Sequence, residues 1–321
     1  MRAALVSEIG RPPASGEAAE PKGGSGRALL EVLAATVNPI DLAIATGSFH
    51  TGAPQTPYTP GKDGVGRVIE AEGLASGSRV YFTTPGGLGG TEGAMAERAA
   101  CAEEELFPVP DGIDAELASC FGIAGLAAWL ALEWRAKLKE GETVLVLGAS
   151  GALGTIAVQA AKLLGAGRVV AAARDRDGLE RARRLGADAT VDLSRGGDLA
   201  AAFREAAEGE IDVTVDPLWG PPAVAAAEAS ARFGRLVQIG QSAGAEATIA
   251  SSSVRGKMLS ILGHTSQVAP REVRAAADEQ MVEHAAAGRL TMEHESYPLE
   301  RVGEMWERQA GFPYRKLMVV P

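Results

Sequence analysis

Short, continuously apolar runs alternate with amphipathic stretches in the middle of the chain. The apolar runs predict strands at residues 143–147, 168–173, 189–192, 211–215 and 235–240, about 20 to 25 residues apart. The stretches between them have helical periodicity. Strands that are apolar along their whole length are typical of a parallel sheet with helices on both faces. The pattern therefore predicts an α/β domain built on a doubly wound parallel sheet.

The two ends of the chain have a different pattern. β-like runs separated by Gly and Pro lie at residues 3–6, 28–37, 66–71, 79–84 and 95–100, and again at 290–297 and 316–320. Helices are predicted at 116–132, 271–287 and 299–308. Because the tail shares the strand-and-turn character of the opening segment, we expect both ends to form one mostly β domain. The predicted domains are residues 1–112 together with 266–321, and residues 113–265.

Two glycine-rich segments lie within the first of these domains. Residues 10–26 are rich in Gly, Pro, Ser and Glu and predict a loop. Residues 86–93, with the sequence GGLGGTEG, predict a hairpin loop, with a mobile lid as the alternative.

Composition excludes several classes of protein. The 31 basic and 41 acidic side chains give a net charge of −10, whereas a nucleic-acid-binding protein normally presents a clustered positive surface. The two cysteines, Cys101 and Cys120, are too few and too far apart for a disulfide framework or a metal cluster. No apolar run approaches the roughly 20 residues that cross a bilayer. We therefore expect a cytoplasmic protein that binds neither nucleic acid nor a membrane.

A glycine-rich turn follows the first strand of the α/β domain. The segment GASGALG, residues 148–154, lies between that predicted strand and a helix that continues to Leu164. In this position Gly151 lets the backbone approach a pyrophosphate, and Gly154 permits close packing of the helix on the strand. Free amide groups at the start of the helix face the anion. The turn thus predicts dinucleotide binding, by Ser150, Gly151, Ala152, Leu153 and Gly154.

Two other interpretations of this turn are open. The glycines can serve only to make a tight connection between a strand and a helix. Alternatively, Gly148, Ser150 and Ala152 approximate the nucleophile elbow of an α/β-hydrolase. Asp216 and His264 then follow in the order of the hydrolase triad. The repeated strand–helix pattern favours dinucleotide binding over both interpretations.

Charged residues follow the strand predicted at 168–173. In NAD sites an acidic residue at the end of this strand holds the ribose hydroxyls, about 20 residues beyond the glycines. The corresponding position is nearest Ala173, and Arg174 and Arg176 come after it. Guanidinium groups at that place favour a 2′-phosphate. NADP(H) is therefore the predicted cofactor, and Asp175 is the acidic residue of the NAD alternative.

Seven short motifs follow one another along the chain. They are NPID (38–41), PGKDGVG (60–66), GSRVY (77–81), AGLAAW (124–129), GETVLVLGASGALG (141–154), LGAD (185–188) and LVQIG (236–240). Together they resemble the medium-chain dehydrogenase/reductase superfamily, and within it the quinone oxidoreductase branch. The resemblance covers nearly the whole chain. It implies a GroES-like catalytic domain built from both chain ends, a Rossmann-type cofactor domain that includes Gly240, and a homodimer.

The resemblance also bears on metal binding. Zinc-dependent alcohol dehydrogenases of this superfamily hold catalytic zinc with a Cys, a His and a Cys, at positions that match Asn38, Lys62 and Cys120. Only Cys120 is retained. Because catalytic zinc needs three protein ligands, we expect no metal site.

A zinc-free member of the superfamily delivers hydride from NADPH to an acceptor that is already polarised, a quinone or an α,β-unsaturated carbonyl compound. Asn38 and Lys62 are the candidate catalytic residues, the first to hold a substrate oxygen and the second to stabilise developing negative charge. The expected function is therefore a zinc-independent, NADPH-dependent quinone or enone reductase. The alternatives are a 2-enoyl-thioester reductase and a nucleotide-binding protein without turnover.

Overall fold

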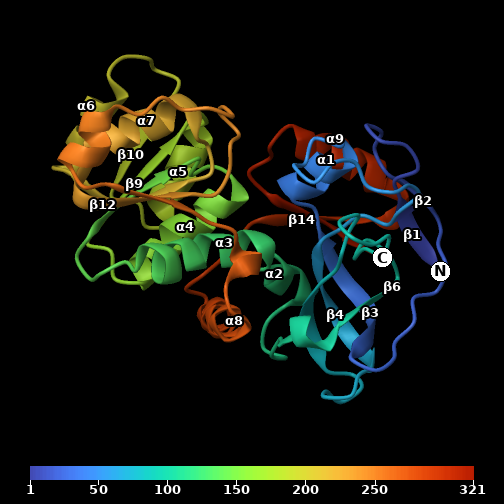
Figure 1. The fold of residues 1–321 in the computed structure, drawn as a ribbon. Helices are drawn as coiled ribbons and strands as arrows, with labels where there is room; N and C mark the ends of the chain where they lie inside the picture. Colours follow the sequence, from blue (N-terminus) through green and yellow to red (C-terminus); the bar gives the residue numbers. More distant parts are fainter. The chain divides into compact units, whose positions relative to one another are not determined.

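The computed structural model describes all 321 residues, which form two compact units. Unit 1 comprises Met1–Ile123 and Asp278–Pro321, and unit 2 comprises Ala124–Ala277. Figure 1 shows the N-terminal segment, in blue, and the C-terminal segment, in red, together in unit 1. Helix α8, Arg271–Ala286, spans the second boundary between the units. The domain boundaries interpreted from the sequence, after residues 112 and 265, both lie N-terminal to those of the units.

A six-stranded sheet forms the centre of unit 2. Its order is β10-β9-β8-β11-β12-β13, and every neighbouring pair is parallel. The strands are β8 (Thr143–Leu147), β9 (Arg168–Ala173), β10 (Ala189–Asp192), β11 (Ile211–Asp216), β12 (Ser230–Gln238) and β13 (Ser260–Gly263). The bounds of β8, β9 and β10 are those predicted from the sequence. β12 begins earlier than predicted, and β13 has no counterpart among the predicted strands.

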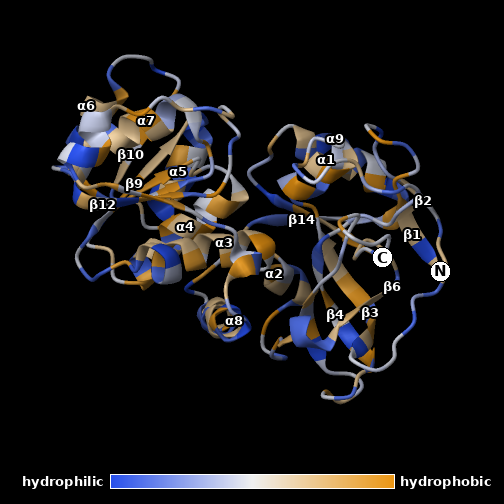
Figure 2. Cartoon of the chain, in the orientation of Figure 1, coloured by the Kyte–Doolittle hydropathy of each residue, from blue (hydrophilic) through white to orange (hydrophobic).

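Helices cover this sheet. They are α3 (Ile123–Leu130), α4 (Ala152–Leu163), α5 (Arg176–Arg184), α6 (Leu199–Ala207) and α7 (Gly220–Ala229), with π-helical turns at Ala131–Ala136 and Ser252–Gly256 and a 3-10 turn at Ser266–Val268. Phe203 of α6 packs with Leu145 of β8 and Leu236 of β12 in a fully buried cluster. In Figure 2, α7 carries apolar colours, whereas α6 has hydrophilic residues among its turns. None of the helices is both long enough and apolar enough to cross a membrane.

Unit 1 is mostly β. Its seven-stranded sheet has the order β14-β15-β3-β4-β5-β7 with β6 paired to β3, and β1 and β2 form a separate pair. The strands are β1 (Arg2–Leu5), β2 (Ala14–Glu17), β3 (Arg27–Thr36), β4 (Asp63–Glu70), β5 (Arg79–Thr83), β6 (Arg98–Ala102), β7 (Phe107–Pro108), β14 (His294–Pro298) and β15 (Lys316–Val320). The helices are α1 (Pro39–Ala45), α2 (Ala115–Ser119) and α9 (Val302–Ala310), with 3-10 turns at Glu103–Glu105 and Leu299–Arg301.

The C-terminal strand β15 lies inside this sheet. It pairs in parallel with β14 and antiparallel with β3, so a strand from the end of the chain contacts one from its beginning. The expectation that both chain ends build one mostly β domain is therefore confirmed.

The helix predicted over residues 116–132 is interrupted. α2 ends at Ser119 and α3 begins at Ile123. Between them, a Cβ on Gly122 would lie 2.3 Å from Oδ2 of Asp63. The Ile123 amide donates to the same oxygen at 2.8 Å across 60 residues of sequence. The run of Ala and Leu does not reveal this break, because a carboxylate far away in the chain causes it.

The two glycine-rich segments of unit 1 are ordered turns and strands. β2, Ala14–Glu17, lies within the loop predicted at 10–26. In the segment 86–93, Gly86 and Gly87 have φ values of 51° and 94°. A Cβ on Gly93 would lie 2.0 Å from the carbonyl oxygen of Thr59. Such tight packing favours the loop interpretation of this segment over the lid.

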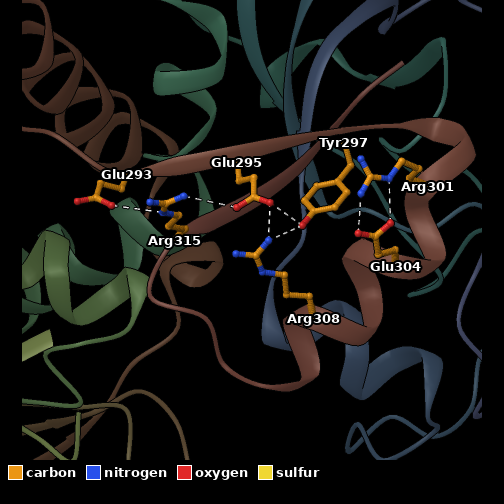
Figure 3. Close-up of polar contacts among 7 residues, drawn as sticks. All are labelled: Glu293, Glu295, Tyr297, Arg301, Glu304, Arg308 and Arg315. Atoms are coloured by element: carbon orange, nitrogen blue, oxygen red, sulfur yellow. Dashed lines mark hydrogen bonds and ion pairs between the residues drawn. The ribbon is translucent and has the colours of Figure 1, made fainter. Parts of the chain in front are cut away.

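A network of charged side chains lies along the outer strand β14 (Figure 3). The Tyr297 hydroxyl donates to Glu295 at 2.7 Å and accepts from Arg308 at 2.7 Å. Arg308 also pairs with Glu295, and Arg315 lies 3.4 Å from Glu293. Charged side chains on an edge strand oppose pairing with a further strand.

Candidate functional site

The glycine turn of unit 2 connects β8 to α4. Gly148, with a φ of 63°, begins the turn, and Gly151 is the N-cap of α4. A Cβ on Gly154 would lie 2.3 Å from the carbonyl oxygen of Gly148, so only glycine fits at this position without a shift. A Cβ on Gly151 would meet its nearest atom at 3.6 Å, which is an ordinary contact. Gly154 is therefore required by packing, whereas Gly151 leaves the backbone accessible.

The first turn of α4 has the properties of an anion site. No side chain caps this helix, and Ser150, Gly151, Ala152 and Leu153 are all partly exposed. Backbone amides at a helix start carry partial positive charge and bind phosphate groups. The donors needed to hold a pyrophosphate are thus in place.

The turns after β11 and β12 lie beside the glycine turn. A Cβ on Gly148 would lie 3.1 Å from Cδ2 of Leu218, and a Cβ on Gly240 would lie 2.7 Å from the carbonyl oxygen of Pro217. Ligands in doubly wound sheets bind at the carboxyl ends of the strands. Gly240 therefore lies at the same edge of the sheet as Gly148–Gly154.

Asp216 organises the turn after β11, for which the sequence predicted no role in cofactor binding. Its Oδ1 accepts from the amides of Leu218 and Trp219, both at 2.9 Å. Burial raises the pKa of this carboxyl, against the two amide hydrogen bonds that lower it. Trp219 has a φ of 56° and a ψ of −160°, a region that glycine normally occupies. No local sequence pattern reveals this conformation, because the residue there is not glycine.

Arg174 is exposed directly after β9. Asp175, the acidic residue of the NAD alternative, is the N-cap of α5: its carboxylate accepts from the amides of Asp177 and Gly178 and lies 3.3 Å from Arg181. Arg176 is exposed, and its Nε lies 3.7 Å from Asp192. The carboxylate of Asp175 is thus engaged in the helix cap.

The hydrolase triad does not assemble. The Asp216 carboxylate bonds to its own turn, and no hydrogen bond joins it to His264 or to Ser150. The His264 ring lies 6.1 Å from the ring of Trp134, and burial lowers the pKa of this imidazole to about 4. Ser150 packs close to Gly178 of α5. The three residues therefore do not form a nucleophilic site.

Unit 1 contains the two predicted catalytic residues, and both are buried. Asn38 is 2% exposed and precedes α1. Its Nδ2 donates to Oδ1 of Asp63 at 3.0 Å and to Oγ1 of Thr36 at 3.2 Å, while its Oδ1 accepts from Nζ of Lys316 at 2.5 Å. The Lys62 ammonium donates to the Pro85 carbonyl at 2.9 Å.

Asp63 is the anion at the centre of this network. It is fully buried and accepts from the Thr36 hydroxyl at 2.5 Å, in addition to Asn38 and the Ile123 amide. The Tyr81 hydroxyl lies 3.5 Å from Oδ2 of Asp63. Burial lowers the pKa of Lys62, and the carboxylates of Asp41 and Asp63 oppose that shift.

Asp41 is a second buried carboxyl group. Its Oδ2 accepts from the Asn38 amide at 2.7 Å, whereas its Oδ1 has no hydrogen-bond partner. Burial, followed by the charge of Asp63, raises the pKa of Asp41 to about 7. The group is thus poised to titrate near neutral pH.

The residues at the three zinc-ligand positions do not fit a metal. The oxygen of Asn38 is bonded to an ammonium, and Lys62 is itself a cation. The Cys120 thiol donates to the Glu116 carbonyl at 3.3 Å, and burial raises the pKa of this thiol to about 12. Zinc binds thiolates, neutral imidazoles and carboxylates. No group of three or more His, Cys, Asp and Glu side chains is arranged to hold a metal ion.

Lys316 and Asp63 belong to this network, although the sequence predicted no role for either residue. A signal for Lys316 exists, because it begins an otherwise apolar run, KLMVV, that forms a buried strand. Lysine is almost never fully buried unless it is paired.

Comparison with known proteins places this geometry in a family. Residues 24–111 match the alcohol dehydrogenase GroES-like domain, and residues 152–281 match the zinc-binding dehydrogenase domain. The quinone oxidoreductase of Pongo abelii is 29% identical over 323 residues, which cover 96% of this chain and 93% of that protein.

Two solved structures resemble the whole chain. The quinone oxidoreductase from Thermus thermophilus, solved also as its complex with NADPH, is 28% identical with a TM-score of 0.79, and the match covers 100% of both chains. An alcohol dehydrogenase superfamily protein from Novosphingobium aromaticivorans is 26% identical with a TM-score of 0.87, covering 100% of this chain and 99% of that one. With its GroES-like and Rossmann-type domains, the chain belongs to the medium-chain dehydrogenase/reductase superfamily of oxidoreductases, in its quinone oxidoreductase-like branch.

Proposed function

We propose that the chain is an NADPH-dependent reductase that transfers hydride to a quinone or an α,β-unsaturated carbonyl compound without zinc. The observation that carries the proposal is the pairing of a phosphate-binding helix start with an exposed Arg174 and an acidic neighbour, Asp175, that is engaged in a helix cap. The relatives named quinone oxidoreductase, one of them solved with NADPH, support the same cofactor and substrate class.

The cofactor is assigned to unit 2. The backbone at Ser150–Gly154 would bind the pyrophosphate, and Arg174 and Arg176 would bind the 2′-phosphate. Gly240, at the end of β12, would allow the backbone there to pack closely on the Pro217 carbonyl beside the cofactor. When bound, a nicotinamide supplies the hydride, which carries two electrons.

The acceptor is assigned from the chemistry of the donor set. Asn38, Lys62 and Cys120 do not form a metal site, so no metal ion held by them would polarise a carbonyl group of the substrate. A conjugated acceptor delocalises the incoming electron pair itself. It takes up hydride and one proton from solvent, to give a quinol or a saturated carbonyl compound. Asn38 and Lys62 stay our candidates for stabilising the developing negative charge on its oxygen, a role for which Asn38 must exchange its hydrogen bond to Thr36 or Asp63 for one to the acceptor.

A panel of quinones, enones and 2-enoyl thioesters, each with NADPH and with NADH, tests this proposal. Quinones or enones should support NADPH oxidation, and simple alcohols with NADP should give no reduction. Preference for the thioesters would favour the enoyl-thioester reductase, whereas cofactor binding without turnover of any acceptor would favour a non-catalytic nucleotide-binding protein. Elemental analysis of active protein should find far less than one zinc per chain.

The roles of Asn38 and Lys62 are tested by Asn38→Ala and Lys62→Ala. Both variants should lower kcat while leaving NADPH affinity unchanged. A loss of cofactor affinity in either variant would reassign that residue to cofactor binding.

We also propose that the protein is a homodimer and that it acts in the cytoplasm, where Cys101 and Cys120 stay reduced. The dimer is supported by β13, which ends the strand order of its sheet and exposes Ile261. Met258, just before this strand, is 53% exposed. Edge strands with apolar side chains readily pair with another chain. Light scattering should find a dimer for the wild type and a monomer for Ile261→Lys.

A further inference from the structure

Lys316, the first residue of β15, carries a buried ammonium group. The side chain is 3% exposed, and its Nζ donates to Oδ1 of Asn38 at 2.5 Å and to the Val37 carbonyl at 3.2 Å. Burial lowers the pKa of this ammonium, and the acidic groups of Asp63, Cys120 and Asp41 oppose that shift and favour the charged form. A buried charge is tolerated only where it is paired and hydrogen-bonded.

The carboxamide of Asn38 lies between two opposite charges. Its oxygen accepts from the Lys316 ammonium, and its nitrogen donates to the Asp63 carboxylate at 3.0 Å. Turning the amide over would set its NH2 group against the ammonium and its oxygen against the carboxylate. Both contacts would be repulsive, so Lys316 and Asp63 together fix one orientation of Asn38.

The ammonium also lies close to the positions that match the zinc ligands of zinc-dependent relatives. Two of the three positions that match zinc ligands in zinc-dependent relatives, Asn38 and Cys120, interact with Lys316. The third position, Lys62, is a second cation and is 6% exposed. A divalent ion among these residues would be repelled at short range with little screening by water.

We propose that the Lys316 ammonium is a fixed positive charge that takes the place of a metal ion's charge in this site. Lys316 acts as a positioning residue that holds Asn38 in one orientation. Its charge also prevents a divalent metal from binding. The feature is encoded by the C-terminal strand, separately from the ligand positions themselves.

A designed metal site tests the exclusion directly. Asn38→Cys with Lys62→His restores two zinc-ligand types beside Cys120 and removes the charge of Lys62, so Lys316 is the remaining cation. Purified full-length protein is dialysed against zinc sulfate, and zinc per chain and zinc affinity are measured. Adding Lys316→Met to this double variant should tighten zinc binding by about tenfold or more, the scale on which neighbouring groups tune metal sites. Equal zinc affinity with and without Lys316 would overturn the proposal.

Two further variants serve as controls for this test. Arg315→Met, added to the double variant instead, removes a neighbouring cation whose guanidinium points toward Glu293 and Glu295 (Figure 3), and it should leave zinc affinity unchanged. Lys316→Gln gives a second, uncharged but polar replacement if the Met variant does not fold. Folding of each variant is checked by circular dichroism, and a folded Gln variant that binds zinc no better would also count against the proposal.

The positioning role has a separate readout, which rests on the proposed reductase function. In the wild-type background, Lys316→Met should lower kcat for the acceptor with unchanged NADPH affinity, and Lys316→Arg should restore part of kcat. A fall in NADPH affinity instead of kcat would refute the positioning role. If the wild-type protein reduces no acceptor, the proposed function fails, while zinc binding by the designed variants still decides the exclusion.

Discussion

The polar network of unit 1 and the glycine turn of unit 2 are built in opposite ways. Asn38, Asp63 and Lys316 are buried and bond mainly to one another through their side chains. The turn at Gly148–Gly154 offers backbone amides, and its residues are partly exposed. The first arrangement satisfies its own charges, whereas the second leaves donors for a ligand. Substitutions should therefore reduce stability in the network and cofactor affinity at the turn.

The largest effect is expected for Asp63→Ala. This change removes the carboxylate to which Asn38, Thr36 and Ile123 donate and takes from the Lys316 ammonium the carboxylate that acts on it most strongly. Breaking a buried charge pair in this way costs about 3 to 5 kcal/mol of unfolding free energy. Urea unfolding measures the loss. In the control Glu31→Ala, an exposed carboxylate 3.6 Å from Arg67 is removed, and the cost should be below about 1 kcal/mol.

Asp41→Asn should change how stability depends on pH. Because the pKa of Asp41 is raised in the folded protein to about 7, the folded state holds this proton more tightly than the unfolded state. Stability from this group is present at acidic pH and is lost as pH rises toward 7. The neighbouring charges of Asp63, Lys62 and Lys316 act on the same carboxyl group.

The Asn variant cannot lose this proton. From pH 5 to pH 8, its unfolding free energy should therefore rise relative to that of the wild type by about 3 kcal/mol, since the pKa of Asp41 lies about two units above pH 5 and each unit is about 1.4 kcal/mol. Thermal unfolding across this range provides the measurement. Parallel pH profiles for the two proteins would show that Asp41 does not titrate in this range.

In unit 2, the exposed Arg174 after β9 sharpens the comparison, because Arg174→Ala should spare stability. Loss of the 2′-phosphate contact should weaken NADPH binding by about 1.5 to 3 kcal/mol and leave NADH binding nearly unchanged. Fluorescence titration with both cofactors measures this difference, and Arg184→Ala on the exposed end of α5 is a matched control. An equal loss for both cofactors would remove Arg174 from the 2′-phosphate site.

Gly154→Ala is the exception at the turn: its new Cβ would meet the backbone of Gly148 at 2.3 Å, so it should cost about 1 to 3 kcal/mol of unfolding free energy, less than Asp63→Ala. At Gly151, with a φ of −82°, a new Cβ would make only an ordinary contact at 3.6 Å, so Gly151→Ala should unfold at the wild-type temperature. Its added methyl group should still weaken cofactor binding. If Gly151→Ala destabilised the protein as much as Gly154→Ala, the accessible backbone that we assign to the glycine turn at Gly151 would be wrong.

Much of unit 2 could be predicted from the sequence because its signals are local. The strands β8, β9 and β10 are continuous apolar runs, and the glycine turn lies within seven residues, Gly148–Gly154. Each of these strands, and the turn, is specified by residues that are neighbours along the chain. The turn at Asp216 to Trp219 and the strand β13 were not evident, since a positive φ at Trp219 and the partly exposed edge of a sheet have no local pattern.

By itself, the sequence determined the two-part α/β and β architecture, the family and the glycine turn, because hydrophobic period and short motifs act over a few residues. Only the tertiary structure decided which charges meet in unit 1. Lys316 and Asn38 are 278 positions apart, and they come into contact because β15 pairs with β3. The same pairing buries their charges, and burial, which no local pattern of residues encodes, makes an ordinary lysine and asparagine into a closed polar network.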